Sequence, residues 1–599
     1  MSFSYNALSR RSLLRAMAAL AGAAVIPTLG SKRARAKMPN LPSDFGRGRS
    51  VAIVGAGVSG LTAGWKLAKA GYQVTIYEGD DRYGGRSLTP RPSDERYKRW
   101  WFAKYNPERL FDKMYVSEYK EDERRNPNAV KQVCTFMDDG WHPEREQSPV
   151  ELFFNAGPGR MPSDHVELIK LCRETGVALE PYIFQSNYNL MQNDAFAEGE
   201  PFVYNRVDHS LRGAVAEMMA ELVKRGLVVE GLAPDRKQQM LEMLQGFGDL
   251  NVDYRFKGSG RVGYSHLPGG WRDAPVKKEP MALGEILNSG FVGGGNPETS
   301  PGSYIFNADN IDWQNSLMQP VGGMDRVWQR LLVQEVPAAA VRMRNDDPRG
   351  NELKTRQSRF VGDLVFLEHE IISMNDVEGE NQVRIDYQFR NSQGGIERGS
   401  EVVDYCISTM QPQLVAKVNS ALPQSFKDSL MRVKQTSAIK VGWQTLYRFW
   451  EQENNIYGGI SWTTDPIGQI WYPSEDFNAR TAAITGAYNR GPAADEFGKL
   501  DQGHRLDVAL RGGEKLHPGF AKKVYRDRGL TVAWQYMPFQ VGGWASDTAY
   551  EQPEVYAEIT NPPPSRIYLA GDTWSYLPGW QEGAITAAYE AIDRMSRAN

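Results

Sequence analysis

The stretch that decides the fold is SVAIVGAGVSG, residues 50–60. Its first half, Ser50–Val54, is a short apolar run, which predicts a buried strand of a parallel sheet. The glycines that follow have the spacing Gly-x-Gly-x-x-Gly, and they are Gly55, Gly57 and Gly60. Glycines at this spacing allow a tight turn, a close approach of the backbone to a pyrophosphate, and close packing of a helix on a strand. The stretch therefore predicts the start of a dinucleotide-binding fold.

The residues after this turn supply the context that the glycine motif needs. Leu61–Ala70 has helical spacing and strong helix formers, and Gly71 ends the helix. Tyr72–Tyr77 predicts a second strand, which ends at Glu78. A helix N-terminus stabilises phosphate groups, and an acidic residue beyond the second strand accepts hydrogen bonds from ribose hydroxyls. We therefore predict an α/β fold with a Rossmann-like domain, in which the three glycines and Glu78 bind the cofactor.

A second glycine turn indicates which dinucleotide is bound. The segment DDRYGGRS, residues 80–87, places Gly85 and Arg86 directly after the second strand. An FAD needs such an element because its pyrophosphate and isoalloxazine are held along an extended path, whereas an NAD has no general need for it. The segment resembles the Gly-Gly-Arg turn that contacts FAD in the flavin amine oxidase family. This resemblance implies FAD as the cofactor, and the C-terminal flavin stretch has no cysteine, which predicts non-covalent binding.

Later segments extend the resemblance over nearly the whole chain. PVGGMD at 320–325 resembles a segment that precedes a helix of the cofactor domain, and YCIST at 405–409 resembles a strand that returns to it. The stretch 566–584 resembles the C-terminal flavin-binding region of the family. Asp572 stands where glutamate is common, so its carboxylate reaches one methylene less far. The further cofactor contacts that the resemblance implies are Gly157, Ile371, Gly571, Asp572, Trp580 and Ala584.

The segment FFNAGPGRMP, residues 153–162, indicates the substrate. It resembles the Gly-Pro-x-Arg-x-Pro element of L-amino-acid oxidases, whose arginine binds the substrate carboxylate and matches Arg160 here. A planar guanidinium can hold a carboxylate with two parallel hydrogen bonds and so fix which face of Cα is presented. A structural salt bridge or a phosphate contact of Arg160 is the alternative. The chain is most similar to bacterial L-amino-acid oxidases with a twin-arginine signal.

Three further segments carry candidate substrate residues. Tyr472 matches a tyrosine that donates its hydroxyl to the carboxylate in the family, and Trp471 precedes it; a buried aromatic with a satisfied hydroxyl is the alternative. Lys440 lies in an otherwise apolar strand. The matching lysine of the family holds a water near flavin N5 and assists reoxidation by oxygen; a lysine that reaches the surface is the alternative. Trp580, after Gly579, is expected to form an aromatic wall over the substrate amine.

The predicted reaction is the oxidative deamination of L-amino acids to 2-oxo acid, ammonia and hydrogen peroxide. The predicted catalytic residues are Lys440, Arg160 and Tyr472. The arginine and the tyrosine orient the substrate so that a hydride passes from Cα to flavin N5. No catalytic base is assigned, because His165 is more commonly read as a structural histidine. An amino-acid 2-monooxygenase that yields an amide and CO2, an amine or alkaloid oxidase, and a non-catalytic exported flavoprotein remain as alternatives.

Composition excludes several other functions. The 599 residues carry a net charge of −3, which gives no indication of nucleic-acid binding. The three cysteines are far apart and the seven histidines form no HExxH pattern, so neither a disulfide framework nor a metal site is predicted. The pair Arg10-Arg11 and the apolar run behind it predict a cleavable twin-arginine signal over residues 1–36 and a periplasmic or secreted protein without a membrane anchor. A homodimer is expected from its frequency and from the resemblance.

The order of the segments predicts two interleaved domains and a helical subdomain. The FAD-binding domain comprises 47–90, 318–425 and 560–599, and the substrate-binding domain, with a mixed sheet, comprises 151–185 and 426–559. A polar insertion at 91–150 and a helical subdomain at 186–317 complete the chain. Helical periodicity is strongest at 164–176, 210–225 and 236–247.

Overall fold

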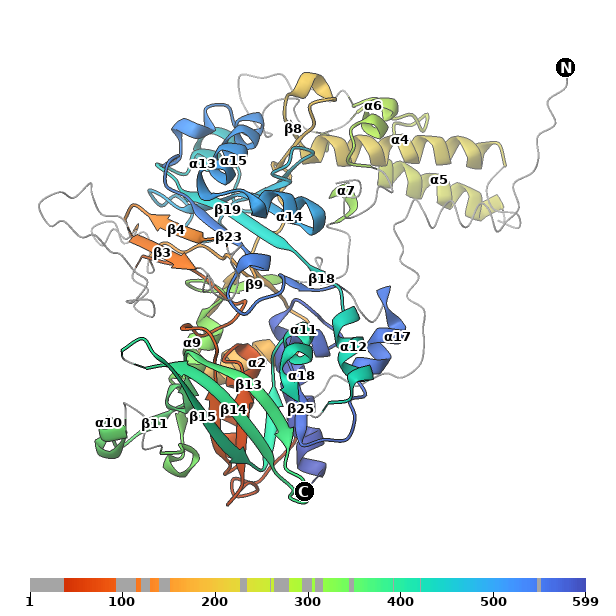
Figure 1. Ribbon diagram of the computed structural model, residues 1–599. Helices are drawn as coiled ribbons and strands as arrows, with labels where there is room; N and C mark the ends of the chain where they lie inside the picture. Colours follow the sequence, from red (N-terminus) through yellow and green to blue (C-terminus); the bar gives the residue numbers. More distant parts are fainter. Residues whose placement is uncertain are drawn as a thin grey trace, which may run out of the picture.

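The computed structural model describes most of the chain, and Figure 1 shows it as two lobes with a helical hairpin that projects from one of them. The described residues are 37–92, 115–119, 130–138, 140, 151–226, 234–258, 260–262, 280–292, 304–307, 316–343, 350–391, 393–420, 422–546 and 551–598. The predicted signal at 1–36 and most of the predicted insertion at 91–150 lie outside these residues.

The first lobe is built on a parallel sheet of five strands, with the order β12-β2-β1-β16-β25. The strands are β1 (Ser50–Val54), β2 (Gln73–Tyr77), β12 (Val365–Phe366), β16 (Tyr405–Ser408) and β25 (Ile567–Leu569). Two helices, α2 (Val58–Lys69) and α18 (Gln581–Arg597), pack against each other beside this sheet. Strands from distant parts of the chain thus form one Rossmann-like sheet, which confirms the predicted fold class.

A smaller sheet covers this lobe and extends the binding surface. Its order is β15-β14-β13-β17, and its strands are β13 (His369–Asp376), β14 (Val383–Arg390), β15 (Ile396–Val403) and β17 (Asn419–Ser420). The register of β13 on β14 shifts between Ile371 and Ser373. A shift of this kind turns a strand locally and re-aims its side chains. Ile371 is buried at 7% exposure, on the part of β13 that borders the cofactor cavity.

The second lobe is built on a mixed sheet of nine strands, with the order β3-β4-β23-β19-β22-β21-β20-β7-β8. The strands are β3 (Tyr115–Tyr119), β4 (Gln132–Phe136), β7 (Leu190–Gln192), β8 (Phe202–Val203), β19 (Ala438–Gln444), β20 (Ile460–Thr463), β21 (Gln469–Trp471), β22 (Ala483–Arg490) and β23 (Leu530–Ala533). The helices α13 (Phe449–Asn454), α14 (Gly491–Lys499) and α15 (Gln502–Leu516) cover one face (Figure 1).

This sheet reaches further along the sequence than the predicted substrate-binding domain. β3 and β4 come from the range predicted as an insertion, and β7 and β8 come from the range predicted as a helical subdomain. These strands are two to five residues long. Such short strands show too few alternating positions to be recognised by periodicity, and they are fixed by pairing with a distant strand.

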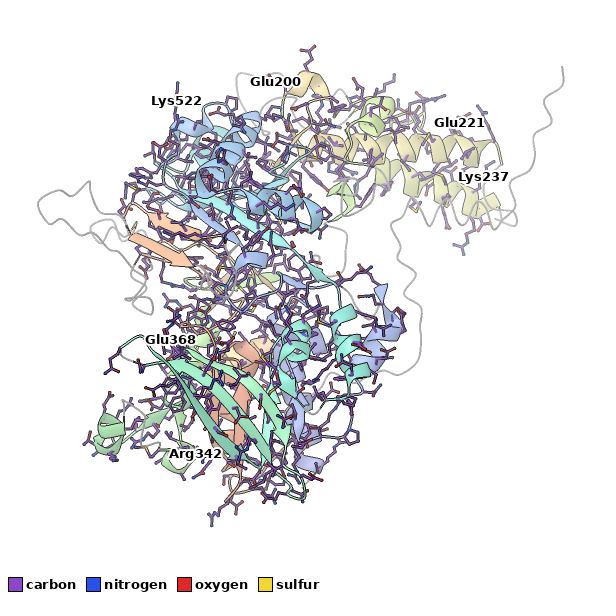
Figure 2. The ribbon with its side chains drawn as sticks, viewed as in Figure 1. Glu200, Glu221, Lys237, Arg342, Glu368 and Lys522 are labelled. Atoms are coloured by element: carbon purple, nitrogen blue, oxygen red, sulfur yellow. The ribbon has the colours of Figure 1, made fainter. Side chains whose placement is uncertain are left out.

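Within the range predicted as a helical subdomain, α4 (Tyr204–Lys224) and α5 (Pro234–Gly248) form an antiparallel hairpin. Figure 2 places Glu221 of α4 and Lys237 of α5 on the outer part of this hairpin. Its apolar seam includes Ala216, Ala220 and Leu244. The hairpin therefore confirms the helical periodicity that the sequence showed at 210–225 and 236–247. Among the helices of the described residues, none combines the length and the apolar character that crossing a membrane requires.

The remaining elements include a small sheet beside the 153–160 segment and short helices and strands of both lobes. A three-stranded sheet, β5 (Met161–Pro162), β9 (Leu317–Pro320) and β6 (Leu179–Pro181), lies directly after the 153–160 segment and fixes its end. The other helices and strands are α3 (Val166–Thr175), α6 (Leu283–Asn288), α7 (Tyr304–Asn307), α9 (Arg326–Leu332), α10 (Gly350–Thr355), α11 (Pro412–Lys417), α12 (Gln424–Arg432), α17 (Pro553–Ile559), β10 (Glu335–Val336), β11 (Arg359–Phe360), β18 (Gln435–Thr436) and β24 (Trp544–Ala545).

Candidate active site

A cavity of about 720 Å³ extends from the glycine turn of the first lobe to the open face of the nine-stranded sheet. At its first end it is lined by residues of the dinucleotide motif and of β13, and at its other end by side chains from β19 to β22. The predicted contacts that line it are Gly55, Gly57, Glu78, Gly85, Arg86, Gly157, Arg160, Ile371, Lys440, Trp471, Gly571, Asp572, Gly579, Trp580 and Ala584. Cavities of this size suit small organic molecules and cofactors.

The three motif glycines have three different reasons to lack a side chain. Gly55 has φ +106°, a region that L-residues rarely adopt, and a Cβ there would overlap the Thr409 side chain. A Cβ on Gly60 would overlap Gly55 O, so this glycine allows helix α2 to pack against the turn. A Cβ on Gly57 would meet only Gly84 O at 4.0 Å, because Gly57 borders the cavity. The space beside Gly57 is therefore available to a ligand.

The start of α2 is suited to phosphate groups. Gly57 is the N-cap of this helix, and no side chain caps its first N–H groups. The partial positive charge of a helix N-terminus stabilises anions that approach it. Together with the open space at Gly57, this arrangement fits the pyrophosphate of a dinucleotide.

Glu78 is fixed by the backbone at the same end of the cavity. Its Oε2 accepts a hydrogen bond from Ala56 N at 2.8 Å, and its Oε1 accepts one from Asp80 N at 2.9 Å. Burial raises the pKa of the Glu78 carboxyl from its ordinary value to about 7, and the nearby Asp80 adds to this effect. Each carboxylate oxygen can accept further hydrogen bonds, so the position remains suited to ribose hydroxyls.

The arginine of the second glycine turn pairs with Asp572. Arg86 Nη1 donates to Asp572 Oδ2 at 3.0 Å, and Arg86 Nη2 donates to Asp572 Oδ1. Gly579 N donates to Asp572 Oδ2 at 2.7 Å. The carboxylate thus joins the second glycine turn to the C-terminal stretch. This pairing explains how aspartate serves where the family has glutamate, because the shorter side chain meets its partners within the protein.

Arg160 lies at the far end of the cavity between aromatic rings. Its Cζ is 4.9 Å from the ring centroid of Phe184, 4.9 Å from that of Trp471 and 5.7 Å from that of Tyr182. Rings at this distance attract a guanidinium and hold its stem in place. The cation is therefore presented at the cavity in a fixed position, where it can bind a carboxylate.

Lys440 is buried on β19 beside the same arginine element. Its Nζ donates to Asn155 O at 2.7 Å and to Gly157 O at 2.8 Å, and it is 4.3 Å from the ring centroid of Trp471. Burial lowers the pKa of the Lys440 amine well below its usual value, and the positive charge of Arg160 lowers it further. A neutral amine that donates to two carbonyls keeps its lone pair to accept a proton or a hydrogen bond.

The prediction that Tyr472 borders the substrate is wrong. The Tyr472 hydroxyl donates to Ser461 Oγ at 2.7 Å and lies 2.6 Å from His517 Nε2, within the apolar core on the helix-covered side of the sheet. Gln469 and Trp471 of β21 line the cavity instead. Successive residues of a strand point to opposite faces, so one of the two neighbours faces the cavity and the other faces the core.

The register of the sheet decides which of the two faces the cavity. The pairing of β19 with β22 shifts by one residue between Val441 and Gly442, so Gly442 lies opposite Thr485. Trp471 is also paired with Thr485. Lys440 and Trp471 are thereby brought to the same face, where the Nζ of one contacts the ring of the other. Because a shift of one residue exchanges the two faces of a strand, the sequence of β21 alone could not show this.

Trp580 lies where the C-terminal stretch meets the cavity. The His165 ring stands on it edge-to-face, with centroids 4.9 Å apart and an interplanar angle of 85°. His165 is buried but is not part of the cavity lining, which favours the reading of a structural histidine. Glu582 accepts hydrogen bonds from Glu167 N and Leu168 N, so it binds the start of α3 to the start of α18.

Several side chains that contact the cavity were missed by the sequence reading. Phe184, Trp462 and Arg490 line it. Gln581 Nε2 donates to Ser87 Oγ at 2.9 Å, and Trp534 Nε1 donates to Ala156 O at 2.9 Å, so both support the cavity wall. The alternation of Ile460 and Trp462 on β20 was a detectable signal, whereas Arg490 is brought to the site only by strand pairing.

The described residues include no cluster of histidine, cysteine, aspartate and glutamate side chains that could hold a metal ion. The three cysteines, Cys134, Cys172 and Cys406, are buried free thiols.

Two sequence families match the chain. Residues 352–595 match the model of the flavin containing amine oxidoreductases, and residues 53–112 match that of the NAD(P)-binding Rossmann-like domain. Similar curated proteins include an L-amino-acid oxidase of Sistrurus catenatus edwardsii, 23% identical over 565 residues that are 92% of this chain and 87% of the relative. An L-amino acid oxidase of Bothrops pictus is 24% identical over 561 residues, 92% of this chain and 91% of the relative.

Solved structures show the same fold at low sequence identity. A triple mutant of putrescine oxidase, redesigned in cofactor binding, has a TM-score of 0.50 and 16% identity, covering 92% of this chain and 99% of that chain. Cyclohexylamine oxidase from Brevibacterium oxydans IH-35A has a TM-score of 0.50 and 14% identity, with the same coverage.

The fold and the cavity define a flavin-dependent oxidoreductase. The C-terminal part of the chain, residues 352–595, matches the family of flavin containing amine oxidoreductases. Its cofactor is FAD, bound without a covalent link, and the open space at Gly57, the uncapped helix start and the position of Glu78 fit this group.

Proposed function

We propose that this protein catalyses the oxidative deamination of free L-amino acids. The observation that carries the proposal is the position of Arg160, whose guanidinium is held between Phe184 and Trp471 at the end of the cavity opposite the glycine turn. An amine substrate without a carboxylate has no use for a cation at this place, whereas an α-amino acid does. The L-amino-acid oxidases among the similar proteins agree with this choice.

In this proposal the side chains bind and orient the substrate. Arg160 holds the carboxylate with two hydrogen bonds, and the Trp580 ring bounds the space for the amine and Cα. FAD, when bound, supplies the two-electron oxidation and passes the electrons to oxygen. The amino acid, oxygen and water are converted to a 2-oxo acid, ammonia and hydrogen peroxide.

Lys440 is proposed to act in proton transfer at the same place. Its depressed pKa favours the neutral form of the amine, and the two carbonyl groups of Asn155 and Gly157 fix the direction of the lone pair. A neutral amine in this position can hold a water or take up a proton while oxygen is reduced. Tyr472 has no part in the proposed site, because its hydroxyl belongs to the core network with His517.

The decisive experiment is a product assay over a panel of amino acids. Peroxide, ammonia and the 2-oxo acid should form in equal amounts with at least one L-amino acid, and Arg160→Met should abolish most of this turnover. Formation of an amide and CO2 without peroxide would assign the protein to the amino-acid 2-monooxygenases. Oxidation of simple amines that Arg160→Met leaves unchanged would assign it to the amine oxidases.

We also propose that the enzyme is exported in folded form and acts as a homodimer. The support for export is the Arg10-Arg11 pair and the apolar run that follows it. Mass spectrometry of the protein from its own cells tests the first part, because cleavage after Ala36 leaves Lys37 as the new N-terminus. Sedimentation of the holoenzyme tests the second part.

A further inference from the structure

The charged side chains that line the cavity are unevenly distributed. Its acidic residues are Glu78, Glu370 and Asp572, all in the first lobe, which also contributes the cations Arg86 and Lys417, and Asp572 is paired with Arg86. The nine-stranded sheet contributes two basic side chains, the Lys440 amine and the Arg490 guanidinium, and no described carboxylate to the lining. With Arg160, which lies next to this sheet, the substrate end is a basic chamber.

Arg490 occupies a defined place in this chamber. It is the last residue of β22, and its partner across the strands is Ala438, while Tyr488 is the partner of Lys440. All four residues line the cavity, so they share one face of the sheet. Arg490 and Lys440 are diagonal neighbours, which places their Cβ atoms about 7–8 Å apart. The guanidinium thus lies at the edge of the same space that the Lys440 amine enters.

Arg490 is also free to bind a ligand. Its side chain is exposed, and no described carboxylate lies within ion-pair distance of it. The half-buried carboxyls of Glu180 and Glu475 lie outside the cavity lining and accept hydrogen bonds from Gln319 Nε2.

We propose that Arg490 is a specificity-determining residue that binds a second carboxylate, so that the enzyme prefers amino acids with an acidic side chain over those with a cationic one. The inference rests on the proposed function, because it assumes that Arg160 takes the α-carboxylate. A substrate of this class then spans the chamber from Arg160 to Arg490. Amino acids with a cationic side chain are disfavoured, because like charges meet in a confined space.

Binding of two unreactive acids to the holoenzyme tests the inference without turnover. Glutarate has two carboxylates, and butyrate is the same chain with one of these carboxylates removed. By calorimetry, glutarate should bind about five- to tenfold more tightly, as expected for a hydrogen bond to a charged group that is partly exposed to water. Arg490→Gln should remove this difference while the absorbance of bound FAD stays unchanged.

The matched control is Arg511→Gln, which removes the same charge from an exposed position of α15 outside the cavity lining. It should bind both acids as the unmodified enzyme does. Equal binding of the two acids by the unmodified enzyme, or a glutarate preference that survives in Arg490→Gln, would overturn the inference.

A second measurement separates this inference from the proposed function. The ratio of kcat/KM for glutamate over glutamine should fall in Arg490→Gln, and Arg490→Glu should raise kcat/KM for lysine. If amino acids are oxidised and neither the glutamate-to-glutamine ratio nor the kcat/KM for lysine changes, the inference fails and the proposed function stands. If no amino acid is oxidised and the glutarate preference still depends on Arg490, the proposed function fails and the anion-binding role stands.

Discussion

Replacing Arg160 tests the substrate end of the cavity most directly. Arg160→Met keeps an unbranched apolar stem between Phe184 and Trp471 and removes the guanidinium that those rings hold at 4.9 Å. The substrate carboxylate then loses two charge-assisted hydrogen bonds in a confined site, for which the free energy is about 2–4 kcal/mol. We therefore expect kcat/KM for the best amino acid to fall by about 30- to 900-fold.

The assay is a steady-state peroxide measurement on two substrates. One is the amino acid, and the other is the amine that lacks only its carboxylate. The amine gains nothing from Arg160, so its slow turnover should change less than about twofold. A loss of the same factor for both substrates, or a loss below about threefold for the amino acid, refutes the role of Arg160 in carboxylate binding. Arg160→Lys should give an intermediate loss, since it keeps the charge without the planar fork.

The same substitution has a second consequence at Lys440. The charge of Arg160 contributes to the depressed pKa of the Lys440 amine, although burial is the larger cause. Removing that charge should raise this pKa, so any pH dependence of the reoxidation rate that follows the neutral amine should move to higher pH. Rapid mixing of the reduced enzyme with oxygen over a pH series measures this shift. A pH dependence of the reoxidation rate that does not move, or that moves to lower pH, contradicts the electrostatic coupling of Arg160 and Lys440.

Five further substitutions test separate parts of the structure. Gly57→Ala should weaken FAD binding with little change in apoprotein stability, because the added Cβ enters the cavity. Gly60→Ala should lower apoprotein stability by about 2 kcal/mol or more, because the added Cβ overlaps the backbone. Calorimetry measures the stability of both variants, and titration with FAD measures their cofactor affinity. The Glu78 carboxyl, whose pKa is raised to about 7, stabilises the apoprotein below pH 4.5 and loses up to about 3 kcal/mol of that stabilisation as pH rises through 7. In Glu78→Gln the thermal unfolding midpoint should depend less on pH over this range. An unchanged pH dependence of the midpoint would contradict the raised pKa of Glu78. Tyr472→Phe should lower stability by about 1–2 kcal/mol and change KM by less than twofold. A large rise in KM would show that Tyr472 contacts the substrate. Lys440→Met should slow oxygen-dependent reoxidation about tenfold or more in stopped-flow, and an unchanged rate removes it from that step.

The cofactor end of the molecule could be predicted because its chemistry is local in sequence. Gly55, Gly57 and Gly60 lie within six residues, and the strand that ends at Glu78 follows at once, so one strand–helix–strand unit contains the whole motif. Gly55 and Gly60 are required by the packing of this unit itself, and Gly57 leaves space beside the cavity. The predicted fold class follows from that unit, and FAD follows from the second glycine turn at 80–87.

The substrate end could be predicted only in part. Arg160 and Lys440 lie at the cavity, as proposed from the resemblance, because each is fixed to a strand or a strand end whose apolar pattern is visible. Asp572 was read as a flavin contact, and the structure adds its pairing with Arg86, which lies 486 residues away in the chain. No local pattern encodes a partner at that distance.

What the sequence by itself determined is the dinucleotide-binding unit and, with it, the fold class. Only the tertiary structure decided that Trp471 and not Tyr472 faces the cavity, and that Arg490 joins the substrate end. The first depends on the one-residue shift between Val441 and Gly442, and the second on the pairing of Arg490 with Ala438 across the strands. In a sheet, a shift of one residue exchanges the two faces, and hydrogen bonds between distant strands set that register.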